Sequence, residues 1–164
     1  GALGAGCVDS VLRVRQAPDP IGPFQLAVPR LGEQGRLEWP TARTIESNGI
    51  VWQPFTVDRL ESHLRESKPV FIDFTAEWCL TCKVNEKTVL ADDAVISKLK
   101  ERNIVTMKAD WTNRNETITR LLQKFGRSGV PLYVLFPAGK PTEPIVLPEV
   151  ITTRIVVEAL EKAR

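Results

Sequence analysis

The sequence predicts an α/β domain in which a central mixed β-sheet is flanked by helices, with an extended N-terminal arm. Two observations lead to this fold class. From residue 51 onwards, short apolar strand patterns alternate with helical patterns, and the last two strands follow each other directly, which mixes the strand directions. Residues 70–74 are apolar on both faces except for one acid, which is typical of a strand in the middle of a covered sheet.

The elements follow in order along residues 51–164. The clearest helix lies in residues 118–125, whose apolar side chains recur at i, i+3, i+4 and i+7 before a glycine suited to a left-handed cap. Capping residues mark the other helices, and prolines and turn residues bound the strands. Strands are predicted at residues 51–55, 70–74, 104–109, 130–136 and 143–147; helices are predicted after Thr56, from residue 78 or 79 towards 90, after Asp92 or Asp93, after Asn113, and after Thr152 or Thr153.

Residues 1–50 differ in composition from the rest. They hold five of the 12 prolines and seven of the 10 glycines, and they show no sustained helical or alternating period. We therefore expect a linker or arm over residues 1–50, on which a short apolar piece such as residues 24–28 adds a strand to the domain, and a folded domain over residues 51–164. No apolar run approaches the ~18 residues needed to span a bilayer.

Charge and cysteine content narrow the function classes. The 22 Lys and Arg residues nearly balance 20 Asp and Glu residues, and no block of like charges exists, so the sequence offers no electrostatic basis for binding nucleic acid or anionic lipid. Three cysteines exclude a small fold held together by disulfides. Cys7 stands far from the close pair Cys79 and Cys82, and such a pair indicates reactivity.

The spacing of Cys79 and Cys82 places both sulfurs on one face at the start of a predicted helix. Unpaired N–H groups and the helix dipole favour a thiolate at the first position, so we expect Cys79 to be the nucleophile and Cys82 the resolving thiol. The alternatives are inert core cysteines or half of a zinc site. Zinc would need two more ligands, and Cys7 and His63 lie in no recognisable ligand spacing, so we expect no metal.

Two acids are candidates for supporting the thiols. Asp73 lies within the doubly apolar strand, where burial favours the protonated form, so it is a candidate proton carrier for Cys82. The alternative is an acid satisfied by backbone or hydroxyl donors. Glu86 lies one helical turn beyond Cys82 and is a candidate for tuning the thiols electrostatically; the alternative is a solvated helix glutamate.

Pro131 and Trp78 complete the candidate site. A proline at the head of a strand is often tied to a cis bond, and a cis Val130–Pro131 bond facing the cysteines would leave the Val130 backbone to pair with an extended substrate segment. The residues alone leave cis and trans open. Trp78 is expected to flank the sulfurs, Trp111 to lie in the core or at the rim, and His63 to be an exposed helix residue.

Two of these motifs resemble the thioredoxin family. Residues 72–83, IDFTAEWCLTCK, resemble its active-site strand and helix, and Gly129, Val130 and Pro131 resemble its cis-proline loop. The resemblance extends over residues 51–164 and implies a thioredoxin-like fold with a cis Pro131. Ordinary cytosolic thioredoxins carry Gly-Pro between the cysteines, whereas this chain has Leu80 and Thr81, which argues against a general cytosolic thioredoxin.

Three further segments look like the C-terminal, periplasmic thioredoxin-like domain of the thiol:disulfide interchange protein DsbD family: residues 82–86 (CKVNE), 108–112 (KADWT) and 125–133 (FGRSGVPLY). The likeness implies that residues 1–50 tether the domain to membrane helices. It also implies that Cys79 exchanges, Cys82 resolves, and Asp73 and Glu86 modulate them. Cys7 has no place in the family pattern.

The DsbD resemblance implies a protein-disulfide reductase in the periplasm, tethered to the bacterial inner membrane. A transmembrane cysteine pair of the same protein would donate electrons, and a periplasmic thiol–disulfide protein or domain would accept them. No cofactor is expected beyond the Cys79–Cys82 disulfide. The alternatives are a free-standing thioredoxin-like reductase, for example one serving cytochrome maturation, and a non-enzymatic module of the same fold that binds a partner.

Overall fold

A computed structural model describes residues 30–31, 37–38 and 44–164. The chain forms two compact units, residues 1–43 and Thr44–Arg164, and each is considered by itself. In the first unit, β1 (Arg30–Leu31) pairs antiparallel with β2 (Leu37–Glu38). Most of the predicted arm, including Cys7 and the strand predicted at residues 24–28, lies outside the described residues.

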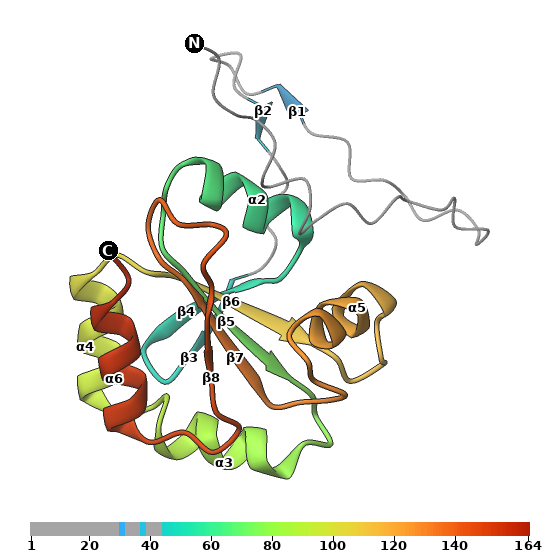
Figure 1. Cartoon of the computed structure of the whole chain (residues 1–164), viewed down its shortest axis with the longest axis vertical. Coiled ribbons are helices and arrows are strands. Elements are labelled where there is room, and N and C mark those ends of the chain that lie inside the picture. Colours follow the sequence, from blue (N-terminus) through green and yellow to red (C-terminus); the bar gives the residue numbers. More distant parts are fainter. Residues whose placement is uncertain (1–29, 32–36, 39–43) are drawn as a thin grey trace. The chain divides into compact units, whose positions relative to one another are not determined.

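The second unit contains one six-stranded sheet in the order β3-β4-β6-β5-β7-β8. The β4–β6 and β5–β6 pairs are parallel and the others antiparallel, which confirms the mixed sheet (Figure 1). The strands are β3 (Ile45–Ser47), β4 (Ile50–Pro54), β5 (Val70–Thr75), β6 (Val105–Asp110), β7 (Leu132–Phe136) and β8 (Ile145–Leu147).

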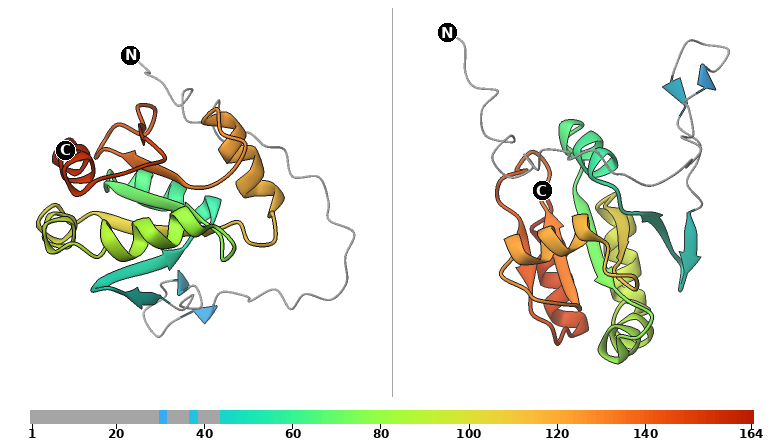
Figure 2. Two further views of the ribbon diagram at one scale, coloured as in Figure 1. Left: turned by 90° about the horizontal axis from the view of Figure 1, so that it is seen from below. Right: turned by 90° about the vertical axis from the view of Figure 1, so that its right-hand side faces the viewer.

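Five helices in the described part of the chain cover this sheet in two layers (Figure 2). One face packs against α4, α6 and the end of α3, and the other packs against α2 and α5. The predicted caps Thr56, Asp92 and Thr152 are confirmed, since each side chain accepts a backbone N–H of the first turn. The helix predicted after Asn113 is α5, and its cap is Asn115. The helices are α2 (Val57–Arg65), α3 (Leu80–Thr88), α4 (Asp93–Glu101), α5 (Glu116–Lys124) and α6 (Thr153–Glu161).

The strand β5 lies between β6 and β7, and all six of its residues are buried. Because side chains alternate along a strand, Phe71 and Asp73 face the layer of α3, α4 and α6, while Ile72 and Phe74 face α2 and α5. Full burial of one such phenylalanine stabilises the fold by roughly 2–3 kcal/mol. The sheet therefore holds Asp73 in place through apolar packing on both faces.

The sequence analysis places the start of the domain at residue 51, but the sheet begins before it. The additional strand β3 pairs antiparallel with β4 across Asn48 and Gly49, whose φ angles are 53° and 76°. Two successive positive φ angles are what a type I′ hairpin requires, and Asn-Gly is the dipeptide that favours it. That dipeptide is the sequence signal that would have extended the domain to residue 45.

Prolines explain the shifted strand ends. Strand β7 starts at Leu132 because Pro131 has no N–H to donate to the ladder, and β8 starts at Ile145 rather than residue 143 because Pro144 precedes it. The helix α3 ends at Thr88, slightly before the predicted end near residue 90. Gly126 has a φ of 70° just after α5, as its predicted capping role requires.

Among the helices in the described ranges, none combines the length and apolar character needed to cross a membrane.

Candidate active site

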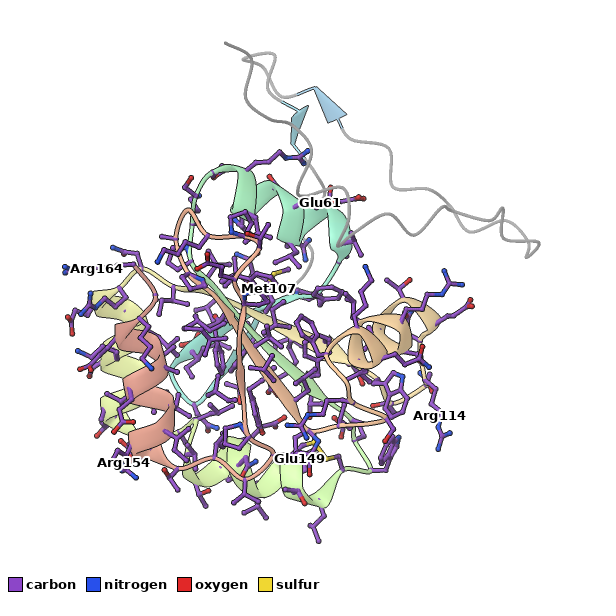
Figure 3. The ribbon with its side chains drawn as sticks, in the orientation of Figure 1. Glu61, Met107, Arg114, Glu149, Arg154 and Arg164 are labelled. Carbon is purple, nitrogen blue, oxygen red and sulfur yellow. A yellow bond between two sulfur atoms is a disulfide. The ribbon has the colours of Figure 1, made fainter. Side chains whose placement is uncertain are left out.

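Cys79 and Cys82 form a disulfide at the start of α3. The S–S distance is 2.03 Å and the Cα atoms lie 5.3 Å apart (yellow bond in Figure 3). Cys79 is the N-cap of the helix, and its sulfur accepts the backbone N–H of Cys82 at 3.2 Å. The predicted helix start is therefore confirmed, with the first cysteine just outside the first turn. In this position a Cys79 thiolate would meet a free helical N–H and the positive end of the dipole.

The two sulfur residues differ in their access to solvent. Cys79 is 6% exposed and Cys82 is fully buried. Both pack against Ala76 and Val130 in a small apolar cluster. Of the two residues, only Cys79 has any surface through which an incoming disulfide could approach.

Thr112, in the loop after β6, anchors the bend that carries Trp78 to Cys79. The Thr112 hydroxyl accepts the backbone N–H of Glu77 at 2.9 Å, and the Thr112 carbonyl accepts the indole N–H of Trp78 at 3.1 Å. The ring of Trp78 packs against Trp111 with centroids 5.8 Å apart. Trp78 directly precedes Cys79 and stays half exposed, whereas Trp111 is buried and its indole N–H donates to Thr119.

The Val130–Pro131 peptide bond is cis, as the thioredoxin resemblance implies. It lies at the start of β7, whose residue Leu132 pairs with Phe74 at the end of β5. Because β5 leads directly into the bend with the cysteines, the antiparallel register brings this loop to the same edge of the sheet. Val130 consequently packs against both sulfur residues.

Asp73 is fully buried beneath this site, and neither carboxyl oxygen has a hydrogen-bond partner among the described residues. The alternative in which backbone or hydroxyl donors satisfy the acid is therefore wrong for the described part of the chain. The register of the sheet sets Asp73 beside Lys108 of β6 and Tyr133 of β7. An unpaired buried acid is costly in its charged form, so its environment favours the protonated state.

Burial raises the pKa of Asp73 from 3.8 to about 7. The positive charge of Lys108 opposes this rise in the pKa, and the negative charge of Glu86 adds to it. The carboxyl group therefore exchanges its proton near neutral pH, which is the range in which a general base or acid for a thiol operates best.

Glu86 is held by three side chains rather than solvated. Its carboxylate accepts the Thr75 hydroxyl at 2.9 Å and lies 3.4 Å from the Lys108 ammonium and 3.9 Å from that of Lys83. The side chain is only 15% exposed, so the alternative of a solvated helix glutamate is wrong. Glu86 thus brings a fixed negative charge to the Asp73 side of α3.

Sequence reasoning missed the role of Lys108. Its ammonium lies 5.1 Å over the Trp52 ring, close to Glu86 and in register with Asp73. The alternation of residues 105–110 was the available signal, because it places Thr106, Lys108 and Asp110 on one face of β6. Which face of β5 they meet depends on the register between strands, which no local pattern contains.

Sequence reasoning also missed Asn85, whose hydrogen bonds link α3 to β7 and to the segment around Glu149. The buried amide of Asn85 donates to the Tyr133 hydroxyl at 3.0 Å and to the Glu149 carbonyl at 3.1 Å. The Glu149 carboxylate in turn accepts from Arg127 at 2.7 Å, in the loop that leads to Pro131. Burial raises the pKa of Tyr133, so its hydroxyl stays neutral. These contacts join α3, β7 and the loop before the cis bond.

His63 does not join the candidate site. It is half-buried on α2 rather than exposed, and its ring bonds to Gln53 at 3.1 Å. Burial lowers the pKa of His63. Among the described residues, no three His, Cys, Asp or Glu side chains gather as metal ligands, and Cys7 lies outside that set. The structure thus supplies no observation that favours the zinc alternative.

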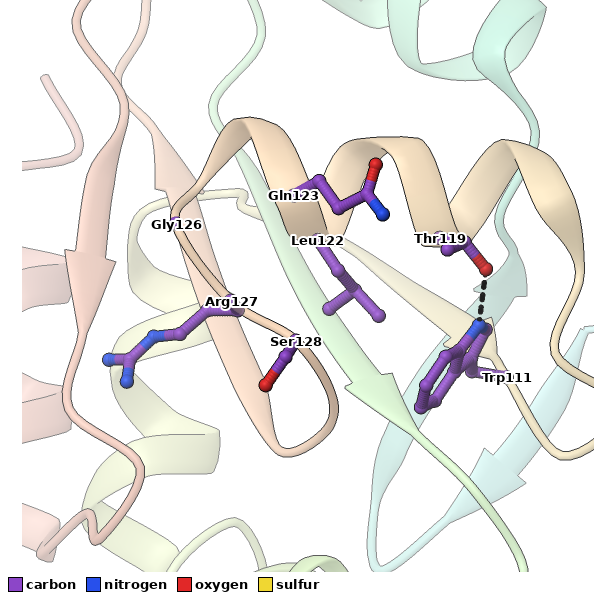
Figure 4. A pocket seen from close by; sticks show the side chains of 7 residues that line it. All are labelled: Trp111, Thr119, Leu122, Gln123, Gly126, Arg127 and Ser128. Atoms are coloured by element: carbon purple, nitrogen blue, oxygen red, sulfur yellow. Dashed lines mark hydrogen bonds between the residues drawn. The ribbon is translucent and has the colours of Figure 1, made fainter.

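An open pocket of about 380 Å³ lies beside the site, between α5 and the loop that follows it (Figure 4). Trp111 and Leu122 form its apolar walls, and Ser128 lines it from the loop after α5. The pocket also contacts Thr119, Gln123, Gly126 and Arg127.

The arrangement suits dithiol–disulfide exchange. It combines a 6%-exposed cysteine at a helix N-terminus, a fully buried second cysteine one turn on, and a buried acid of β5 whose pKa is raised to about 7. An exchange reaction needs these groups for two steps: attack on an external disulfide, and release of the mixed disulfide that results.

Comparison with known proteins places the chain in one family. A family model described as thioredoxin-like matches residues 51–138. The thiol:disulfide interchange protein DsbD 2 of Pseudomonas aeruginosa is 31% identical over 126 residues, which cover 76% of this chain and 20% of that protein. A DsbD of Yersinia pestis is 38% identical over 71 residues, 43% of this chain and 12% of its own length.

Solved structures share the fold. The oxidised C-terminal domain of Neisseria meningitidis DsbD matches with a TM-score of 0.54 at 24% identity, covering 65% of this chain and 91% of that domain. The first thioredoxin domain of mouse protein disulfide-isomerase A4 matches with a TM-score of 0.55 at 21% identity, covering 79% of this chain and 86% of that one.

The matches span between 12% and 20% of the curated relatives, so they concern one region of much longer proteins. The matched family, the mixed sheet and the position of the cysteine pair agree with one another. The chain therefore belongs to the thioredoxin-like family, and its sequence relatives within that family are of the DsbD type.

Proposed function

We propose that this chain is a thiol–disulfide oxidoreductase domain that reduces disulfides in other proteins. The observation that carries the proposal is the Cys79–Cys82 disulfide at the N-terminus of α3, with Cys79 6% exposed and Cys82 fully buried. A structural disulfide needs no such difference in access and no acid with a raised pKa beneath it.

The reaction proceeds in two exchanges. In the reduced domain, the Cys79 thiolate attacks one sulfur of the partner disulfide, forms a mixed disulfide and releases the partner's first thiolate. The Cys82 thiolate then attacks the Cys79 sulfur, which forms the Cys79–Cys82 disulfide and releases the partner's second thiolate. Two electrons pass to the partner, whose two thiolates take up two protons.

Asp73 takes the proton that Cys82 must lose before it attacks. The carboxyl lies under the site with no competing hydrogen bond among the described residues, and its pKa is about 7. Burial is the largest cause of this raised pKa, and the negative charge of Glu86 adds to it. We expect Asp73→Asn to slow resolution of the mixed disulfide more than its formation, and equal slowing of both steps in rapid-quench measurements would remove this role.

Three further residues receive the partner. Val130 packs against the sulfurs, and we propose that its backbone pairs with an extended partner segment beside Cys79. Pro131 follows it and contributes no N–H near the sulfurs. Trp78, half exposed next to Cys79, covers one side of the partner segment.

The source of electrons is proposed from the DsbD resemblance. A cysteine pair in a transmembrane domain of the same protein would reduce the Cys79–Cys82 disulfide, and a periplasmic thiol–disulfide protein or domain would then accept the electrons. This assignment places the domain in the periplasm, tethered by residues 1–50 to the bacterial inner membrane. No cofactor takes part in it.

The electron source has its own test. In cells that produce the full-length protein, the redox state of Cys79 and Cys82 is followed by thiol alkylation. Replacing the membrane cysteines should leave the pair oxidised. A pair that stays reduced without them would support the free-standing reductase instead.

Reduction of insulin disulfides by the purified domain, with dithiothreitol as the electron source, tests the activity itself. We expect turnover by the wild type and none above background for Cys79→Ser, because the buried Cys82 cannot replace it. Equal rates for the two proteins would leave the non-enzymatic binding module as the better account.

A further inference from the structure

The helix α3 is held to the sheet differently from the other helices of the described ranges. In α2, α4, α5 and α6, at least two buried apolar side chains face the core. In α3 the buried residues are Cys82 and Asn85. Cys82 changes its bonding in every exchange. Asn85 is therefore the buried residue of this helix that the chemistry leaves unchanged.

The side chain of Asn85 replaces apolar packing with two directed bonds. Its amide nitrogen donates to the Tyr133 hydroxyl at 3.0 Å and to the main-chain carbonyl of Glu149 at 3.1 Å. Because Asn85 is 5% exposed, breaking either bond would leave a buried donor without water to replace the acceptor. A satisfied buried amide thus restricts the position of α3 more closely than apolar contacts, which tolerate small shifts.

The two acceptors lie on segments connected to Val130 from opposite directions. Tyr133 is three residues after Val130 in β7, where the main chain pairs with β5 and β8. The Glu149 carboxylate accepts from Arg127 at 2.7 Å, and Arg127 is three residues before Val130 in the loop after α5 (Figure 4). Asn85 therefore fixes α3 to the sheet and, through Glu149, to the loop that carries Val130.

The main chain of this loop does not fix Val130 by itself. Among the described residues, Ser128, Gly129 and Val130 take part in no main-chain hydrogen bond, whereas the Arg127 N–H donates to the Leu122 carbonyl at 2.9 Å. The free groups of Val130 are available to an extended partner segment. Side-chain contacts must consequently set where those groups lie relative to the cysteines.

We propose that Asn85 is a positioning residue, which sets the distance between Cys79 and the Val130 main chain that an extended peptide segment requires. The proposal rests on the exchange function and the Val130 pairing proposed above, and it adds which substrates depend on that distance. A protein disulfide engages both Cys79 and the Val130 main chain. A small disulfide without a peptide backbone engages Cys79 alone.

Oxidation of the reduced chain by two disulfides tests the proposal, in a Cys7→Ser background. One is an extended peptide joined to its copy by a single disulfide, and the other is 2-hydroxyethyl disulfide. Rate constants come from acid-quenched samples. Asn85→Leu keeps a similar volume and removes both donors, so the ratio of the peptide rate to the small-disulfide rate should fall about tenfold. Its rate with 2-hydroxyethyl disulfide should stay close to that of the wild type.

Arg127→Gln tests the same link at its outer end, where a variant is easily accommodated because the ion pair with Glu149 is partly exposed. The ratio should fall in the same direction but by less, since an exposed pair is weaker than a buried bond. Arg127→Lys keeps the charge opposite Glu149 and should restore the wild-type ratio.

The matched control is Asn48→Gly. It removes the other side-chain amide that donates to α3, from Asn48 to the Glu86 carbonyl at 3.3 Å, and glycine accepts the φ of 53° at that position. This bond comes from the β3–β4 hairpin, which has no contact with the Val130 loop through Asn85 or Glu149. The control should keep the wild-type ratio.

Three results would overturn the proposal: equal slowing of both disulfides in Asn85→Leu, an unchanged ratio in that variant, or an equal fall in Asn48→Gly. If Asn85→Leu does not fold by circular dichroism, Arg127→Gln decides, and an unchanged ratio there overturns the proposal as well. If the reduced protein reacts with neither disulfide faster than Cys79→Ser does, the exchange function itself fails, and this outcome is distinct from the others.

Discussion

At the scale of single residues, Asp73 is the group whose cost to the fold is hardest to explain without a function. It is fully buried with no hydrogen-bond partner for either oxygen among the described residues. The surrounding charges come from three side chains, Lys108, Glu86 and Lys83, whose effects on its pKa differ in sign. An apolar residue would fit the strand better, so the acid contributes chemistry rather than stability.

The cost should be visible as a pH dependence of stability. Folding raises the pKa of Asp73 from 3.8 to about 7, so the contribution of the acid to stability is fully present below pH 4 and is lost as pH rises through 7. The shift corresponds to about 4 kcal/mol. Between pH 4 and pH 8, the free energy of unfolding of the oxidised wild type should fall relative to Asp73→Asn by up to that amount. Urea unfolding curves across this range measure it, and parallel curves for the two proteins would refute the raised pKa.

The neighbours of Asp73 should shift its pKa in opposite directions. Glu86→Gln removes a negative charge and should lower the pKa of Asp73, whereas Lys108→Met removes a positive charge and should raise it. The carboxyl ¹³C chemical shift of Asp73, followed against pH by NMR, reports both. Lys124→Met on α5 serves as the control and should leave the midpoint unchanged. Shifts of the same sign in both variants would contradict the assigned geometry.

At the scale of elements, the site is assembled where three segments meet at one edge of the sheet. The end of β5 supplies the bend with the cysteines, the loop after β6 supplies Thr112, and the start of β7 supplies Val130. In each segment the strand is held by pairing within the sheet, whereas the residues beyond the strand end are not. Contacts across the loops must therefore set the position of Cys79 relative to a partner.

Thr112 is the loop contact most open to test. Its hydroxyl accepts the backbone N–H of Glu77, two residues before Cys79. Thr112→Val should lower the free energy of unfolding by about 1 kcal/mol and slow insulin reduction severalfold, because the bend loses this anchor. Thr112→Ser keeps the hydroxyl and should behave as the wild type in both urea unfolding and insulin reduction. A valine variant that matched the wild type in both measurements would exclude the anchoring role.

At the scale of the whole molecule, the fold and the position of the reactive pair follow from local patterns. Local sequence patterns predict the strand at residues 70–74, which is apolar on both faces, and the amphipathic helix at residues 118–125. Both elements are confirmed. The pairing of Asp73 with Lys108 depends instead on strand register, and the contacts of Glu86 depend on how α3 packs. Such relations between distant segments leave no periodic trace in the sequence.

The sequence analysis does not predict strand β3, and the reason is different. Its residues Ile45–Ser47 are too few to show an alternation, so only the Asn48-Gly49 turn marks the hairpin. The segment also lies in a region rich in proline and glycine, which favours a linker. Composition therefore predicts that the arm ends at residue 50, whereas the pairing of β3 with β4 shows that the sheet already begins at residue 45.

The central claim is that Cys79 attacks a partner disulfide and Cys82 resolves the product. Trapping the mixed disulfide tests it most directly, in a Cys7→Ser background that removes the third cysteine. Reduced Cys82→Ser should accumulate a stable adduct with a peptide disulfide, detected by mass spectrometry as one peptide linked through Cys79, while Cys79→Ser should form none. An adduct that formed equally well through Cys82, or a wild type that retained its adduct, would contradict the account.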